Sequence, residues 1–179
     1  MPAIGAEMRI LAVDDDMFIR ELLPKIAARV GCPDITVAAS AQKALQTIAA
    51  APVPFDCLLL DINMPEMSGI ELCATVRGMA PYRDTPVIML TAMTDMDHLD
   101  RAFLAGASDY TTKPFDIVDF GQRLQAAKAQ VAARRAKAAL EVGALCGPML
   151  RDGVRDWDAT RLASRAKVAA LINPDALES

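Results

Sequence analysis

The sequence predicts an α/β fold in which helices cover both faces of a parallel sheet. Segments with strand character alternate five times with helical segments, and most of the strand-like runs are continuously apolar, as in strands buried on both faces. Polar residues also stand where these runs end, at Asp14, Asp61, Thr91 and Lys113. Because the carboxyl ends of parallel strands share one edge of the sheet, we expect these four side chains to converge there.

The predicted strands are short apolar or β-branched runs, and the predicted helices have apolar residues three and four positions apart. The strands are residues 9–13, 35–38, 56–60, 87–90 and 109–112. The helices are residues 17–30, 41–50, 66–78, 95–105 and a long segment after Pro114. In the first helix, Asp16 is the expected N-cap. The residues expected on one face of that helix are Phe18, Leu22, Ile26 and Val30.

A length of 179 residues suits either one domain with an appendage or one large domain, and a hydrophobic content of 53% is ample for a core. The cysteines are scattered and form no C-x-x-C motif, which favours a reducing, cytoplasmic setting. The sequence contains no 18-residue apolar run and no basic segment leading an apolar one at its start. We therefore expect neither a membrane span nor a signal peptide.

The charge is distributed unevenly along the chain. Residues 1–120 carry nine Lys and Arg against seventeen Asp and Glu, whereas residues 121–179 carry ten against six. An acidic body thus precedes a basic tail. The tail either presents solvated helix faces or docks on an acidic surface, and the sequence leaves both interpretations open.

The acids predict a site for a divalent cation. Asp14, Asp15 and Asp61 would raise one another's pKa if they stood close together without a counter-ion, and Mg²⁺ (or Mn²⁺) takes hard oxygen ligands of this kind. A phosphoryl group at Asp61 would gain from the ion, from the Thr91 hydroxyl and from the Lys113 cation. Helix capping, a strand-end hydroxyl or a solvated lysine could explain each residue alone. They do not explain why all of them fall at strand ends.

These residues lie in segments that resemble the receiver domain of bacterial two-component response regulators. The similar stretches are ILAVDDD (10–16), LLDINMPEMSG (59–69), PVIMLTA (86–92), GASDY (106–110) and KPF (113–115). The resemblance covers residues 9 to about 130 and implies a doubly wound, five-stranded, flavodoxin-like sheet with strand order 2-1-3-4-5. It predicts a receiver domain at residues 1–130 and a helical C-terminal extension at residues 131–179.

The resemblance also implies roles for particular residues. Asp61 would accept a phosphoryl group from a histidine kinase or a histidine phosphotransfer protein. Asp14, Asp15, Asp61 and the backbone carbonyl of Asn63 would hold the Mg²⁺. The residues that would contact the phosphoryl group or switch with it are Thr91, Ala92, Lys113 and Tyr110. The peptide bond before Pro114 would be cis.

The function expected from this resemblance is that of a response regulator, not of an enzyme beyond its own phosphoryl transfer and autodephosphorylation. It would signal by a phosphorylation-dependent protein contact through residues 95–128 or through the extension. Two alternatives stay open: a phosphate shuttle or sink between histidine proteins, and a regulatory part whose output domain is on another chain. A haloacid-dehalogenase-like hydrolase is disfavoured, because Asn63 stands where that family needs a second Asp.

The sequence after residue 116 predicts helices but contains no familiar output module. Residues 117–131 have apolar residues at helical spacing, and Ala138, Val142 and Leu145 roughly continue the pattern. This helix either packs only on its own sheet or extends into a homodimer contact. A second helix is expected at residues 158–172. The basic cluster at residues 134–137 is too short to indicate a nucleic-acid site.

Overall fold

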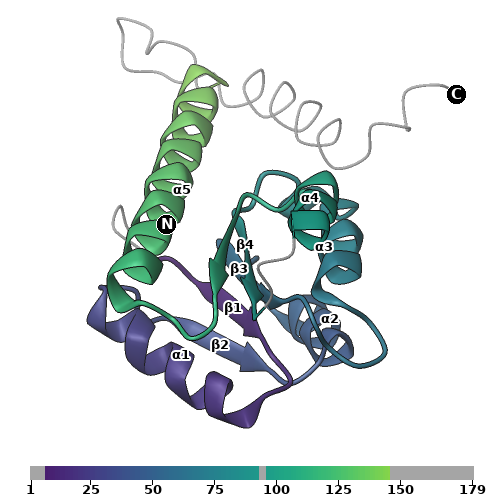
Figure 1. Cartoon of the computed structure of the whole chain (residues 1–179). Coiled ribbons are helices and arrows are strands. Elements are labelled where there is room, and N and C mark those ends of the chain that lie inside the picture. Colours follow the sequence, from purple (N-terminus) through teal and green to yellow (C-terminus); the bar gives the residue numbers. More distant parts are fainter. Residues whose placement is uncertain (1–6, 93–95, 146–179) are drawn as a thin grey trace, which may run out of the picture. The chain divides into compact units, whose positions relative to one another are not determined.

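The computed structural model of the chain describes residues 7–92 and 96–145 (Figure 1). Five strands form one parallel sheet in the order β2-β1-β3-β4-β5. The strands are β1 (Ile10–Val13), β2 (Ile35–Ala38), β3 (Cys57–Asp61), β4 (Val87–Thr91) and β5 (Asp109–Thr112). The helices are α1 (Met17–Arg29), α2 (Ala41–Ala50), α3 (Gly69–Arg77), α4 (Met96–Leu104), α5 (Ile117–Leu145) and a 3-10 turn (Ala80–Tyr82). The predicted doubly wound α/β fold and its strand order are confirmed.

The sheet has two buried faces, each covered by its own set of helices. Alternate residues of the central strands, such as Leu58 and Leu60, belong to a core shared with α2, α3 and α4. The residues between them, such as Leu59, belong to a second core shared with α1 and α5. Figure 1 shows these two layers on either side of the sheet. This double burial is why β1, β3 and β4 are continuous apolar runs in the sequence.

The predicted apolar face of α1 is wrong in its first half. Phe18 is 74% exposed and Leu22 is 40% exposed, whereas Leu23 and Ile26 are buried against the sheet. The predicted residues are spaced by four, and each such step rotates about 40° beyond a full turn at 3.6 residues per turn. Over three steps this drift carries Phe18 roughly 120° away from Val30 around the helix, so the two cannot share the same buried stripe.

Side-chain caps set where the helices begin. The Asp16 carboxylate accepts a hydrogen bond from the Phe18 amide, as expected for the N-cap of α1. At α3, Ser68 and Glu71 form a capping box, in which each side chain bonds the other residue's amide. This box makes α3 begin at Gly69, three residues later than the predicted start at residue 66.

The last described helix, α5, continues past the residues that pack in the core. Phe120, Leu124, Ala127 and Val131 are buried along one stripe of α5 and pack in the core shared with α1. The first compact unit of the chain ends at Ala132. Beyond it, most of the helix residues up to 141 are exposed, and Leu140 is 76% exposed. The predicted helix at 158–172 lies outside the described residues, and the predicted domain boundary stays a prediction. No described helix is long and apolar enough to cross a membrane.

Candidate functional site

The four predicted strand-end residues lie at the same edge of the sheet. Asp61 and Thr91 are the last residues of β3 and β4, while Asp14 and Lys113 directly follow β1 and β5. All neighbouring strands are parallel, so these ends point the same way. Asp14, Asp61 and Thr91 are buried. The sheet topology alone therefore gathers two carboxylates, a hydroxyl and a cation into one region.

The Lys113 ammonium joins two of these acids. Its Nζ atom lies 2.6 Å from Oδ2 of Asp14 and 3.0 Å from Oδ1 of Asp61. Lys113 and Asp61 are 52 positions apart in the sequence. Both carboxylates are nearly inaccessible to water, and the lysine side chain is 16% exposed. The site therefore has a cation held directly beside Asp61.

Three carboxylates at this edge fit a divalent cation. One oxygen from each of Asp14, Asp15 and Asp61 lies within 4.8 Å of the others. Asp15 is exposed and opens the cluster to solvent. Mg²⁺ prefers hard oxygen ligands and keeps several of its waters, so a cluster with one solvent-facing acid suits it. These three carboxylates are the predicted side-chain ligands, and the binding of an ion to them and to the Asn63 carbonyl stays a prediction.

Burial controls the protonation of the central acid. Burial raises the pKa of Asp61 to about 6; the hydrogen bond and charge of Lys113 oppose this, and the charges of Asp14 and Asp15 add to it. For Lys113, burial acts to lower the pKa, but the hydrogen bonds to Asp14 and Asp61 outweigh it and leave the pKa raised. The lysine is thus held cationic, while Asp61 would gain from a second positive charge.

The backbone behind Asp61 requires a glycine. A Cβ atom on Gly69 would lie 2.1 Å from the carbonyl oxygen of Asp61, far inside van der Waals contact. The Gly69 amide also donates to the carbonyl of Ile62 at 3.1 Å. The sequence patterns place Gly69 within the predicted helix at residues 66–78 and within the motif at residues 59–69, and they predict no role for it. Its position directly after the capping Ser68 was the available signal that the start of α3 approaches the end of β3.

The remaining predicted residues surround this centre. Asn63 and Ala92 are exposed in the loops after β3 and β4. The peptide bond between Lys113 and Pro114 is cis. Tyr110 is half-buried, and its ring makes an edge contact with Phe103 at a centroid distance of 6.3 Å. The structure thus joins Asp14, Asp61 and Lys113 by contact, and it places these other residues on the adjoining loops and strand.

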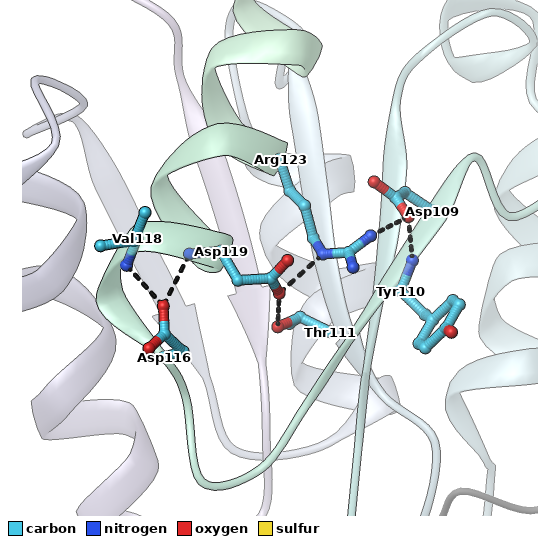
Figure 2. A network of polar contacts seen from close by, with 7 residues as sticks. All are labelled: Asp109, Tyr110, Thr111, Asp116, Val118, Asp119 and Arg123. Carbon is cyan, nitrogen blue, oxygen red and sulfur yellow. Dashed lines mark hydrogen bonds and ion pairs between the residues drawn. The ribbon is translucent and has the colours of Figure 1, made fainter.

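A second charged network, which the sequence analysis missed, joins β5 to α5 (Figure 2). Arg123 of α5 donates from Nε to the Asp119 carboxylate at 2.9 Å and pairs with Asp109 of β5. Its guanidinium also lies 5.2 Å from the centre of the Tyr110 ring. Thr111 completes the network by donating to Asp119 at 3.4 Å. The i,i+4 spacing of Asp119 and Arg123 was a signal for part of it.

Comparison with known proteins identifies the class to which this fold and site belong. Residues 10–125 match the model of the response regulator receiver domain. The chain therefore belongs to the response regulator receiver family of two-component signalling systems, as the sequence motifs predicted. Its relatives are signalling proteins.

Individual relatives agree with this assignment. The chain is 38% identical over 118 residues to the transcriptional regulatory protein YvrH of Bacillus subtilis, covering 65% of this chain and 47% of that protein. It is 39% identical over 118 residues to the transcriptional regulatory protein KdpE of Mycobacterium tuberculosis, covering 66% and 50%. The chain thus spans about half the length of these curated relatives.

Solved structures show the same fold. The Vibrio cholerae chemotaxis protein CheY4 superimposes with a TM-score of 0.63 at 32% identity, covering 68% of this chain and 99% of CheY4. A CheY-like receiver domain protein of Methanospirillum hungatei gives 0.62 at 28% identity, covering 70% and 97%. In both comparisons almost the whole of the other chain is matched. The similarity therefore concerns the sheet and its helices.

Proposed function

We propose that Asp61 accepts a phosphoryl group from a phosphohistidine, with a divalent cation bound at the neighbouring acids. The observation that carries this proposal is the partly buried Lys113 ammonium, held between Asp14 and Asp61 at 2.6 and 3.0 Å. A cation fixed beside a buried carboxylate at the open edge of a parallel sheet is arranged to receive negative charge. The donor would be a histidine kinase or a histidine phosphotransfer protein.

The transfer is a displacement at phosphorus. A carboxylate oxygen of Asp61 attacks, a P–O bond forms, and the P–N bond to the donor histidine breaks. The bonding pair stays with the imidazole nitrogen, and the ring, protonated at its other nitrogen, leaves as neutral imidazole. Asp61 becomes an acyl phosphate. Most of the catalysis of such a loose transition state comes from positioning and electrostatic stabilisation, and both require a preorganised site.

The residues of this chain have distinct tasks in that step. Lys113, held cationic by its two carboxylates, pairs with an oxygen of the arriving phosphoryl group. The Thr91 hydroxyl supplies a hydrogen bond to another oxygen. Asp14, Asp15, Asp61 and the Asn63 carbonyl would hold Mg²⁺ or Mn²⁺, and the bound ion supplies positive charge to the phosphoryl oxygens. After transfer, the new dianion would bias Thr91, Ala92 and Tyr110 toward a second arrangement.

The proposed output is a protein contact that depends on phosphorylation. Residues 95–128 and the C-terminal extension are the surfaces that would make it, since Lys113 and Tyr110 connect the site to this side of the fold. A phosphate shuttle between histidine proteins remains the second candidate. The lifetime of the acyl phosphate separates the two, because rapid return of the phosphoryl group to a histidine partner favours the shuttle.

Phosphoryl labelling in the presence of Mg²⁺ tests the proposal. Radiolabelled acetyl phosphate, or a labelled histidine kinase, should label the wild-type chain but not Asp61→Asn. Asp84→Asn is the matched control, because Asp84 is an exposed carboxylate in a loop on the described chain. Equal labelling of wild type and Asp61→Asn would refute Asp61 as the acceptor. Loss of labelling in the control as well would show that the substitutions act through folding.

A further inference from the structure

The loop that carries two of the acids is held by several bonds. The Asp14 amide donates to the carbonyl of Ala38, at 3.1 Å, which keeps Asp14 in line with the sheet. The Asp16 amide donates to Oδ1 of Asp14 at 2.9 Å, and the Asp16 carboxylate caps α1. These bonds hold amides and side chains. The carbonyls of Asp14 and Asp15 are held by a different residue, Arg20.

Arg20 is the fourth residue of α1, and its side chain folds back over the loop. Its Nη1 atom donates to the carbonyl of Asp14 at 2.8 Å and to the carbonyl of Asp15 at 2.7 Å. Nη1 carries two hydrogens, one for each carbonyl. Successive carbonyls of an extended strand point in opposite directions, so their convergence on one nitrogen defines a turn. The half-buried guanidinium therefore fixes the backbone from which both acids project.

The charge and the hydrogen bonds of Arg20 have opposite consequences for a bound cation. A positive charge next to the acids repels a divalent ion and by itself weakens its binding. The hydrogen bonds orient the two acids before the ion arrives, which strengthens binding. Partners that orient metal ligands typically change metal affinity by about 10- to 100-fold, and we expect this orienting effect to exceed the repulsion at a half-buried site.

We propose that Arg20 is a positioning residue for divalent-cation binding, because it holds Asp14 and Asp15 in the orientation in which they and Asp61 bind the ion. The inference rests on the proposed function for the nature of the ligand. Arg20 does not touch the ion or the phosphoryl group. Lysine is a poor replacement, since its ammonium is a compact, strongly hydrated charge on a flexible stem that is one atom shorter than the path to Nη1 of arginine.

Titration of the full-length chain with Mn²⁺, followed by the electron paramagnetic resonance signal of the free ion, tests this role. Arg20→Lys keeps the charge, and Arg20→Gln removes it. Both variants are expected to bind Mn²⁺ about 10-fold more weakly than wild type. Arg29→Gln, the same change at an exposed position of the same helix, should bind like wild type. Urea unfolding in EDTA, run in parallel, reports whether each variant is folded.

Particular outcomes overturn the inference. If Arg20→Gln binds Mn²⁺ as tightly as wild type or more tightly, charge dominates and the positioning role is wrong. If both variants lose unfolding free energy but keep wild-type affinity, Arg20 is only a structural brace. Should Arg20→Gln fail to fold, Arg20→Lys decides. Wild type that binds no Mn²⁺ would contradict the proposed function itself, whereas unchanged variants of a metal-binding wild type contradict the role of Arg20 alone.

Discussion

Two regions of this receiver domain have the same charge pattern, a cation between two carboxylates. Lys113 lies between Asp14 and Asp61 at the edge of the sheet. Arg123 lies between Asp109 and Asp119, where β5 faces α5 (Figure 2). The members of the first trio are 0–16% exposed, whereas those of the second are 24–44% exposed. Both trios pair one cation with two carboxylates, so apart from the change from an ammonium to a guanidinium the main difference between the regions is burial.

The pKa of a carboxylate shifts in opposite directions in the two trios, and burial is the cause. At Asp61, burial outweighs the lysine and raises the pKa to about 6. At Asp119, the hydrogen bond from Arg123 outweighs a small burial effect and lowers the pKa. In the exposed trio, the cation is therefore sufficient to favour the ionised carboxylate. A buried trio remains short of positive charge, which prepares it to take a divalent ion.

The largest expected difference between the regions follows removal of the buried cation. Lys113→Met leaves two buried carboxylates without their cation and should lower the free energy of unfolding by roughly 3–5 kcal/mol. Urea unfolding in EDTA at pH 7 measures this. Adding Mg²⁺ should restore part of the loss. Lys25→Met, at an exposed position of α1, is the control. A loss at Lys113 no greater than at Lys25 would contradict the importance of burial.

The next effect is the pH dependence that Asp61 contributes in the absence of a metal ion. Its pKa of about 6 in the folded state exceeds its ordinary value of 3.8, so the folded state binds the proton more tightly. Asp61 therefore adds about 3 kcal/mol to the free energy of unfolding below pH ~4. This added stability is lost as the pH rises through about 6. Unfolding of wild type and Asp61→Asn between pH 4 and pH 7 measures it.

The pH dependence expected for Asp61→Asn can be compared with that of Asp119→Asn. Asp61→Asn should be more stable than wild type near pH 7, and the two should converge toward pH 4. Asp119→Asn should behave in the opposite way, because a lowered pKa contributes stability that is lost as the pH falls. If both substitutions change the pH profile in the same direction, the contrast between the buried and the exposed trio is wrong.

The smallest expected effect is at the exposed trio. Arg123→Met removes two half-exposed ion pairs and should lower the free energy of unfolding by only about 1 kcal/mol. Because exposed pairs are screened, the loss should shrink further in 1 M salt. Urea unfolding at low and high salt measures both. A loss comparable to that of Lys113→Met would show that burial does not distinguish the two regions.

Much of the fold and the position of the site could be predicted from local sequence patterns. Continuous apolar runs predicted the bounds of β1, β3 and β4 to within one or two residues, because strands that are buried on both faces consist mostly of apolar residues. Once the strands were parallel, the edge that collects Asp61 and Lys113 followed from topology. The motifs around these residues predicted the receiver family, which the comparisons confirm.

Other features could not be predicted, since they depend on how side chains reach across the fold. The buried face of α1 depends on the angle at which the helix meets the sheet, and spacing by four misplaced Phe18. The roles of Arg20 and Arg123 depend on long side chains that bond backbone or acids from other elements. Gly69 matters because the start of α3 approaches the end of β3.

The sequence by itself determined which chemical groups stand at the ends of the strands, because strand periodicity and apolar runs are local properties. Only the tertiary structure decided how those groups interact: that Lys113 bridges Asp14 and Asp61, and that the pKa of Asp61 rises to about 6. The physical reason is that electrostatic energies depend on distance and on exclusion of water. Both arise only when residues 52 positions apart are packed together.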